Sequence, residues 1–525
     1  MYRPPFIKYY YDTLVYLLKR GHRIHLGFYE ADEPVRELRH QTLADDYPEQ
    51  FSYSIHNRKR KDAWDALCAA CSWGLDYLLY LNPAFNHANR LRERLEFWIH
   101  PVFVWLVNKC PALNTDFGHS LIRSILQIVY DSIPAAESMK RVIGNFEPDV
   151  FLATPLVLPG SLQCEYIRAA RELGIITAVC VASWDNLTTK GFIKGNPDRV
   201  IVWNEIQRGE AVRIHNISPG RVIVTGAQYF DEWFRRQPFR DREEFCRSIN
   251  LPPDRLVLLY MCSSDYSAPN ETRFVRRWVE AIRNARNPKL SQAGILIRPY
   301  PERVEKWKNV DFGVSGGVVL WPPEGEFPLS EEGKSNFYDS IYHSFAVVGI
   351  NTTALIESAI IGRPVLTIVG SEFNNSQTET LHFHYLRQEN GGFLCLAGDL
   401  DDHVRQLEEI VERGDQMKGQ VDRFVGKFVR PHGIETGCVP ILARSIEEQK
   451  LATPERIRQR FVKKVFGYTL YPSAFLLKTI MKLRKKEAGN KRRDKRKLYI
   501  EAGKQGSDPL DYIRARKRGG TLDGT

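Results

Sequence analysis

One strand–helix–strand segment, residues 345–368, constrains the fold more than any other stretch of this sequence. It opens with an apolar run at 345–348 and enters a helical run at Asn351-Thr352-Thr353. Gly362-Arg363-Pro364 ends that run, and a second apolar run follows at 365–368. Asn and Thr favour helix starts, and Gly followed by Pro stops a helix. A strand that leads directly into a helix presents unpaired backbone N–H groups at the sheet edge, which predicts an anion site.

Glu357 stands out in this helical run because its neighbours are apolar. These neighbours are Leu355, Ile356, Ala359 and Ile360. If Asn351 is the N-cap, the capping-box partner falls at position 354, an alanine, so Glu357 does not have that role. Its carboxylate lies either on the solvent face or in a cleft, where it would accept hydrogen bonds from sugar hydroxyls. We favour the cleft, because the phosphate-type helix start lies beside it.

This segment follows the pattern strand–Gly–x–[Asn/Ser]–Thr–x3–4–Glu–x4–Gly–x–Pro–Val. The pattern resembles the donor-binding element of GT-B glycosyltransferases. It is also similar to the matching element of non-hydrolysing nucleotide-sugar 2-epimerases and CDP-glycerol glycerophosphotransferases. The resemblance is tightest to enzymes of surface (capsule-type) polysaccharide biosynthesis. It implies that Asn351, Thr352 and Thr353 hold the donor diphosphate and that Glu357 holds the ribose.

Strands alternate with helices in two consecutive series. Apolar runs lie at 150–153, 176–182, 199–203 and 221–225, and then at 255–262, 294–298, 318–321, 345–348 and 365–368. Such alternation predicts parallel sheets. The expected fold class is α/β, with two Rossmann-like domains that face a cleft in a GT-B-like arrangement.

The expected domains follow from these two series. Residues 1–237 form the acceptor domain and residues 252–445 the nucleotide-sugar donor domain. A helical insertion is expected at about 62–146, and its aromatic stripe is typical of a core more often than of a membrane contact. C-terminal helices are expected at 446–486, followed by a basic, disordered tail at 487–525.

The first residues resemble the start of a GT-B N-terminal domain. A helix is expected at 6–20 and a strand at 23–28, whereas residues 30–60 are polar and expected to be irregular. The strand that should precede the first helix is missing. Either Met1 is a late start or the sheet is built differently.

A polar loop that reads ASWDNLTTKG follows the strand at 176–182. We expect Asp185 to act as the general base for the acceptor hydroxyl, with Lys190 or Asn186 orienting the substrate. The alternative is an Asx-type turn, in which Asp185 or Asn186 caps the following residues. The loop also resembles the WDN-type loop of the polysaccharide enzymes, and we assign Trp184 and Asn186 to acceptor binding.

Two strands of the second domain also end in polar residues. Ser263 and Ser264 would let a phosphate approach the backbone, although a plain turn is equally compatible with them. Arg298 can pair with phosphate. The turn Arg298-Pro299-Tyr300-Pro301 is similar to the K/R-P-H-P turn of glycerophosphotransferase-like enzymes, but Tyr300 replaces the histidine.

Residues 377–386, which read QTETLHFHYL, supply the last candidates. We expect Gln377 to contact the donor and His382 to face it as a catalytic group, with a structural histidine as the alternative. His382 and His384 lie two residues apart, so on a helix they cannot serve one metal site. The sequence contains no acidic cluster typical of a divalent metal, and we expect metal-independent transfer with no cofactor besides the nucleotide-sugar.

The net charge of +11 is confined to the C-terminal end. Residues 478–518 carry 16 Lys/Arg against 5 Asp/Glu, which leaves the rest of the chain near neutral. Aromatic and aliphatic residues at 462–483 precede this run, a composition typical of a helix that meets an anionic membrane. The alternatives are a helix packed on the first domain and, less favoured, nucleic-acid binding. With no secretory signal and nine scattered cysteines, we expect a cytoplasmic protein peripherally attached to the inner face of the membrane.

These features together predict a glycosyltransferase that moves a sugar from a nucleotide-sugar donor to a surface polysaccharide or lipid-linked glycan. Three rivals remain open. They are a nucleotide-sugar 2-epimerase-like isomerase, a CDP-glycerol glycerophosphotransferase-like enzyme and a non-catalytic scaffold of polysaccharide assembly.

Overall fold

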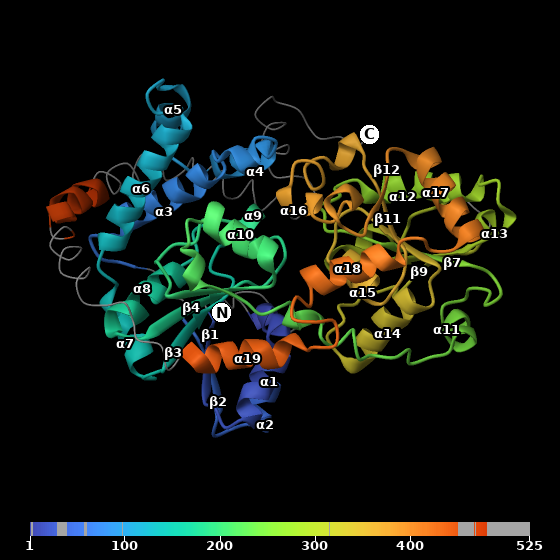
Figure 1. Cartoon of the computed structure of the whole chain (residues 1–525), viewed down its shortest axis with the longest axis horizontal. Helices are drawn as coiled ribbons and strands as arrows, with labels where there is room; N and C mark the ends of the chain where they lie inside the picture. The colour runs from blue at the N-terminus through green and yellow to red at the C-terminus, as the bar shows by residue number, and fades with distance from the viewer. Residues whose placement is uncertain are drawn as a thin grey trace. The chain divides into compact units, whose positions relative to one another are not determined.

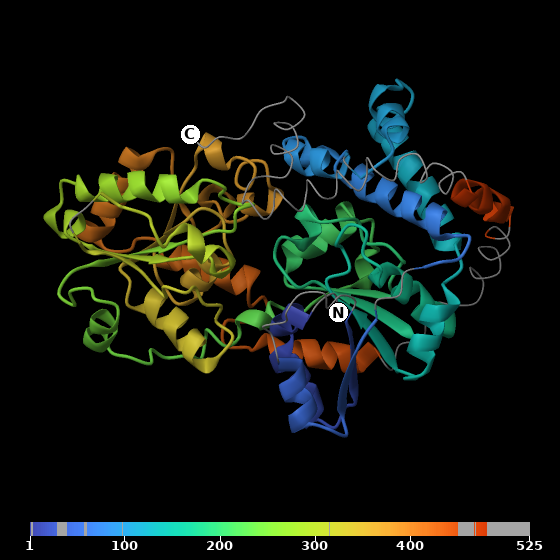
Figure 2. The same cartoon turned by 180° about the vertical axis from the view of Figure 1, so that it is seen from behind.

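The computed structural model describes residues 1, 4–28, 39–56, 60–96, 98–313, 316–449, 467 and 469–479. The chain forms two compact units (Figures 1 and 2). Of the described residues, those in Met1–Asp231 and from Gly426 onward belong to unit 1, and those in Glu232–Val425 belong to unit 2. The expected tail at 487–525 and most of the predicted segment 446–486 lie outside the described residues.

The expected end of the second domain at residue 445 is wrong, because the chain returns to unit 1 at Gly426. Helix α19 (Cys438–Gln449) packs against α1 (Tyr11–Lys19). Leu442 of α19 lies in the same core as Leu14 of α1, and Arg20 forms an ion pair with Glu447 at 2.7 Å. The apolar face of α19 is therefore buried in the first unit.

Unit 2 contains a six-stranded parallel sheet with the order β12-β11-β10-β7-β8-β9. The strands are β7 (Val257–Met261), β8 (Gly294–Arg298), β9 (Val318–Leu320), β10 (Ala346–Gly349), β11 (Val365–Ile368) and β12 (Cys395–Ala397). This is the doubly wound Rossmann order, in which the chain leaves β7 in one direction and continues from β10 in the other. The expected α/β class with parallel sheets is confirmed, although β12 was not predicted.

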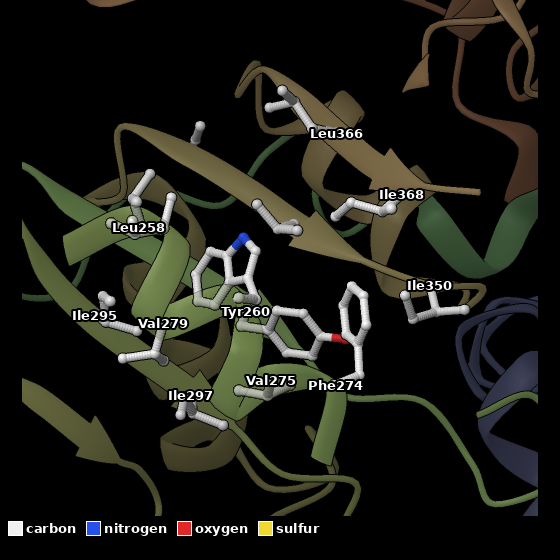
Figure 3. Packing of buried hydrophobic residues seen from close by; sticks show 14 of the residues in the cluster. Leu258, Tyr260, Phe274, Val275, Val279, Ile295, Ile297, Ile350, Leu366 and Ile368 are labelled. Atoms are coloured by element: carbon white, nitrogen blue, oxygen red, sulfur yellow. The ribbon is translucent and has the colours of Figure 1, made fainter. Parts of the chain in front are cut away.

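Helices cover both faces of this sheet (Figures 1 and 2). Helices α12 (Glu271–Arg283) and α17 (Leu400–Arg413) lie on one face, and α14 (Glu331–Tyr342) and α15 (Ala354–Ile360) lie on the other. The apolar residues of α12 recur at helical spacing, and Figure 3 shows Phe274 and Val275 packed against Tyr260 and Ile297 of the sheet. Unit 2 also contains, among the described residues, α11 (Arg242–Ser248), α13 (Pro288–Ser291) and α16 (Leu381–His384), and α18 (Lys418–Phe428) crosses its boundary with unit 1.

Unit 1 contains two separate parallel sheets. The larger has the order β3-β4-β5-β6, from Val150–Ala153, Ile176–Cys180, Arg199–Val202 and Val222–Val224. The smaller pairs β1 (Ile24–Phe28) with β2 (Phe51–Ile55). The expectation that residues 30–60 are irregular is wrong for the described part, which holds α2 (Arg39–Asp46) and β2. The aromatic and β-branched content of FSYSI is typical of a strand.

No strand precedes α1 among the described residues, and a short 3-10 helix, η1 (Pro4–Tyr9), leads into it. The hydroxyl of Tyr10 donates to the carbonyl of Cys180 at 3.0 Å and accepts from Thr154 Oγ1 at 2.9 Å. A side chain thus satisfies backbone and hydroxyl groups at the ends of β3 and β4. Among the described residues, η1 and Tyr10 thus occupy the start of unit 1 without adding a strand to either sheet.

The predicted insertion is helical. It contains α3 (Asp65–Leu79), α4 (Asn89–Glu96), α5 (Pro101–Lys109), α6 (Asp116–Ser132) and α7 (Glu137–Gly144). Its aromatic residues divide into two groups, because Trp64 and Tyr77 are buried whereas Trp105 on α5 is 60% exposed. The interpretation of the stripe as core is correct for α3 and wrong for α5. Within the described ranges, no helix combines the length and hydrophobicity needed to cross a bilayer.

Candidate functional site

The loops that follow β7 and β10 meet at the point where the strand order of unit 2 reverses. The backbone N–H of Asn351 donates to Ser263 Oγ at 3.3 Å. Both residues are buried, and Ser264 beside them is partly exposed. In doubly wound sheets, ligands bind outside the carboxyl ends of the strands at this switch point. The structure thus brings together the predicted donor residues Ser263, Ser264 and Asn351.

The backbone beyond Asn351 offers a run of unused donors. Helix α15 begins at Ala354, and its N-cap residue, Thr353, makes no side-chain capping bond. Asn351 is therefore not the N-cap, and its amide donates instead to the carbonyl of Ser376. Among the described residues, the N–H groups of Thr352, Thr353 and Ala354 have no acceptor. Three consecutive free amides at a sheet edge can bind an anionic ligand.

Glu271, the first residue of α12, fixes the loop after β7. Its carboxylate accepts the N–H of Ser263 at 3.0 and 2.9 Å and the hydroxyl of Tyr260 at 3.2 Å. Burial raises the pKa of Glu271 well above its ordinary value. Sequence reasoning missed this residue, because an acidic residue in the first turn of a helix has an ordinary explanation in the helix dipole.

Arg298 lies at the carboxyl end of β8 and is 4% exposed. Its Nη1 donates to Ser340 Oγ at 3.2 Å, and its guanidinium lies over the rings of Trp321 and Phe337 at 5.4 and 5.3 Å. Burial lowers the pKa of Arg298 to about 10, so the group stays cationic at neutral pH. Its contact with a phosphate stays a prediction.

Glu357 is buried within unit 2, so the solvent-face alternative is wrong. It is 4% exposed, and its Oε1 accepts the indole N–H of Trp233 at 3.2 Å. Its negative charge acts on Arg298 and partly opposes the lowering of the pKa of that guanidinium.

Gln377 and His382 are also buried. The amide of Gln377 donates to the carbonyls of Ile350 and Ile368 at 3.3 and 3.0 Å. It thereby joins the carboxyl ends of β10 and β11 and supports the loop that carries Asn351. His382 lies in the short helix α16. Donor contacts of these two residues stay predictions.

In unit 1, the polar loop after β4 is organised around Asp185. Thr189 Oγ1 donates to Asp185 Oδ2 at 2.8 Å, and Lys190 Nζ lies 3.3 Å from the same oxygen. The side chains of Asp185 and Lys190 are 23% and 29% exposed. The loop therefore presents a partly exposed carboxylate paired with a cation, and the role of Asp185 as a general base stays a prediction.

The two predicted acceptor-binding residues of this loop, Trp184 and Asn186, are buried. Asn186 Oδ1 accepts the N–H groups of Ala182 and Ser183, both at 3.2 Å. Asn186 thus closes the turn after β4 by bonding residues that precede it, so the Asx-type alternative, in which it caps the following residues, is wrong for Asn186. Its Nδ2 also donates to Asp185 Oδ1 at 3.3 Å, so Asn186 orients the carboxylate.

The helical insertion holds this loop in place. Tyr80 donates through its hydroxyl to the carbonyl of Lys190 at 2.5 Å, and Arg94 Nη2 donates to the carbonyl of Thr189 at 2.6 Å. Asp76 of α3 accepts the N–H of Phe192 at 2.7 Å and forms an ion pair with Lys194. Burial raises the pKa of Asp76 even beside this lysine. The sequence signal that could have identified Asp76 is a single carboxylate in the apolar run LDYLL.

His215, which lies just after α10 (Glu205–Arg213), contacts the same loop. Its Nδ1 accepts the N–H of Ile193 at 3.1 Å, and its Nε2 lies 2.8 Å from the carbonyl of Leu187. Accepting at Nδ1 places the single proton on Nε2. Burial lowers the pKa of His215 to about 4, so the folded unit contains the neutral imidazole.

We expect acid to destabilise unit 1 through His215. Between pH 6.5 and 4 the unfolded chain binds a proton that the folded chain does not, so the free energy of unfolding falls by about 1.4 kcal/mol per pH unit and about 3 kcal/mol in total. Urea unfolding of the wild type and His215→Gln across this range measures the difference. The stability of the variant should fall less steeply, and parallel pH profiles would contradict the expectation.

Among the described residues, no group of three or more His, Cys, Asp or Glu side chains could hold a metal ion. The predicted donor residues lie in unit 2 and Trp184, Asp185, Asn186 and Lys190 in unit 1.

No protein-family model matches the chain, and no curated protein matches its sequence. Among solved structures, it is similar to a glycosyltransferase from Rickettsia africae, with 9% identity and a TM-score of 0.46 over 85% of this chain and 93% of that one. It is also similar to a putative UDP-N-acetylglucosamine 2-epimerase from Listeria monocytogenes, with 12% identity and a TM-score of 0.47 over 87% and 97%. These are two of the enzyme classes that the motif at 345–368 resembles. Identities this low carry no information on reaction or substrate.

Proposed function

We propose that this chain is a glycosyltransferase that moves a sugar from a nucleotide-sugar donor to a surface polysaccharide or lipid-linked glycan without a metal ion. One observation carries the proposal. Ser263 and Asn351 are joined across the switch point of a Rossmann-ordered sheet, beside the three free amides of Thr352, Thr353 and Ala354. A nucleoside diphosphate is the ligand class that suits this combination.

The proposal assigns donor binding to unit 2. The amides from Thr352 to Ala354 receive the diphosphate, and the hydroxyl of Ser264 supplies a further hydrogen bond. Arg298 at the carboxyl end of β8 adds positive charge, and Glu357 is assigned to the ribose hydroxyls. These donors neutralise the diphosphate as the bond between it and the sugar breaks, and so no metal ion is needed for charge compensation.

Acceptor activation is assigned to unit 1. Asp185 takes the proton of the acceptor hydroxyl while that oxygen forms the new bond to the sugar carbon. Lys190 and Thr189 orient the carboxylate, and the insertion fixes the loop through Tyr80 and Asp76. An epimerase would need no acceptor, a glycerophosphotransferase would move a different group, and a scaffold would bind no nucleotide.

The proposal places the chain in the cytoplasm, attached peripherally to the membrane through its basic C-terminal residues. The excess of Lys and Arg at 478–518 supports this, since each cation near an anionic surface contributes about 1 kcal/mol.

Isothermal titration with UDP, GDP, CDP and CMP tests the donor site, and Ser264→Asp is the decisive variant. The added carboxylate lies in the loop that would meet the diphosphate, so we expect the affinity for the preferred nucleotide to fall at least about tenfold through like-charge repulsion. The neutral variant Ser264→Asn should keep most of the affinity.

Gln292→Glu is the matched control, because it adds the same charge just before the amino end of β8, at the opposite edge of the same sheet. Equal losses of nucleotide affinity in Ser264→Asp and Gln292→Glu would show that the net charge of the protein, and not a charge at the switch point, determines binding. If the wild type bound none of the nucleotides, the scaffold alternative would replace the enzyme.

A further inference from the structure

Helices α5 and α6 of unit 1 present an apolar face to solvent. On α6, the exposed residues Phe117, Leu121, Ile125 and Ile128 recur at intervals of four, four and three, which places them along one side of the helix. On α5, the residues Val102, Trp105 and Leu106 do the same. Their exposed fractions range from 37% for Leu106 to 77% for Phe117. These seven residues are called the α5–α6 face below.

The opposite side of this pair is packed within unit 1. The carbonyl of Val107 on α5 lies 3.0 Å from His119 Nε2 on α6, and Tyr130 of α6 is fully enclosed. A Cβ atom at Gly74 of α3 would meet Leu126 of α6 at 2.8 Å, so α3 and α6 are in close contact. The face is thus held rigidly on the unit, and α5 stands away from the four-stranded sheet (Figures 1 and 2).

The surrounding sequence is poor in charge. Between Trp98 and Tyr130 the charged residues are Lys109, Asp116 and Arg123, whereas 26% of the whole chain is charged. A single carboxylate in this stretch leaves little to repel an anionic surface. Indole rings such as those of Trp98 and Trp105 favour the boundary between water and lipid.

A second exposed apolar strip leads into the basic end of the chain. Tyr471, Phe475 and Leu476 lie on one side of the helical residues 469–479 and are 47–60% exposed. This segment is attached to unit 1, since Lys478 Nζ donates to the carbonyl of Lys61 at 2.8 Å and Tyr471 packs against Trp64. Residues 478–518, which begin at the end of this segment, carry a surplus of 11 positive charges.

We propose that the α5–α6 face is a membrane-docking surface that inserts its apolar side chains into the interfacial region of an anionic bilayer. The lipid surface is favoured over a second copy of the chain, because the chain carries a net charge of +11, concentrated in its basic C-terminal segment, and two copies would repel. An anionic bilayer instead attracts that segment while the face supplies buried apolar area. The inference goes beyond nucleotide binding and does not depend on it.

Co-sedimentation of the full chain with vesicles tests the docking surface. The vesicles are phosphatidylcholine alone and phosphatidylcholine mixed with phosphatidylglycerol. We expect Trp105→Glu/Ile125→Glu to reduce the partition coefficient on both vesicle types at least about tenfold, because two apolar contacts are replaced by charges. The control Phe239→Glu changes an aromatic residue of unit 2 that is 75% exposed, and it should bind as the wild type does.

Varying the salt concentration separates the ionic contribution to vesicle binding from the apolar contribution. Raising the ionic strength should weaken binding to the phosphatidylglycerol vesicles and leave binding to phosphatidylcholine alone nearly unchanged. Circular dichroism and thermal unfolding verify that the double variant is folded. Unchanged vesicle binding of the double variant overturns the proposal. So does a wild type that ignores vesicles and forms a dimer in light scattering which the double variant lacks, since the face would then join two copies.

Discussion

Asp185→Asn should reduce sugar transfer by a factor of about 10² to 10⁴ while leaving the affinity for the nucleotide unchanged. The amide has nearly the shape of the carboxylate and can still accept from Thr189, but it cannot take a proton from the acceptor hydroxyl. Because the nucleotide residues lie in unit 2 and Asp185 in unit 1, binding and catalysis should separate in this variant. Titration with the preferred nucleotide and a transfer assay with its sugar conjugate measure the two quantities.

Thr189→Val is the companion variant. It removes one donor to Asp185 and keeps the size of the side chain, so a smaller loss of transfer is expected than in Asp185→Asn. If Asp185→Asn transfers sugar as fast as the wild type, Asp185 is not the general base. If the wild type interconverts the bound sugar without any acceptor, the isomerase alternative is correct and the transferase proposal is wrong.

Lys194→Met should destabilise unit 1 by about 3–5 kcal/mol, because it leaves the carboxylate of Asp76 buried without its cation. The side chains of both partners are at most 1% exposed. Burial raises the pKa of Asp76 even with Lys194 beside it, and removing two charges from water costs free energy that their attraction has to offset. The pair is therefore costly to break but contributes little net stability as a pair.

A double-mutant cycle tests this directly. Asp76→Asn/Lys194→Met removes both charges and retains an oxygen to accept the N–H of Phe192, so its free energy of unfolding should lie closer to that of the wild type than that of Lys194→Met does. Urea unfolding of the four proteins gives the coupling energy. Additive effects of the two substitutions would show that the charges do not interact. Transfer activity of the double variant reports whether the loop at 185–194 keeps its position.

Several features of the site could be predicted because they depend on local chain chemistry. Gly362-Arg363-Pro364 ends α15 whatever surrounds it, since Gly362 adopts φ +82° and the following proline cannot continue the helix. The start of the helix was predicted less well. Asn351 donates to Ser376, a residue on a loop that is distant in the sequence, and that contact replaces the expected cap.

The remaining differences between the predicted and the observed site concern which side chains are buried and what surrounds them. Arg298 was correctly placed at a strand end and Glu357 in a helix, yet the sequence does not show that Phe337 and Trp233 contact them or that Ile350 contacts Gln377. Each enclosing residue comes from another element, so only the folded chain brings it near. The same holds for Asp76 and Glu271, whose partners Lys194 and Ser263 follow different strands.

The sequence by itself determined that this chain forms parallel α/β sheets and which loops follow their strands, because strand, turn and helix preferences act over a few neighbouring residues. The tertiary structure decided the strand order, and with it the meeting of Ser263 and Asn351 at the switch point. It also decided that Trp105 is exposed while Tyr77 is buried, although both lie in apolar helices. Strand order and burial depend on contacts between residues distant in the chain, which no local pattern records.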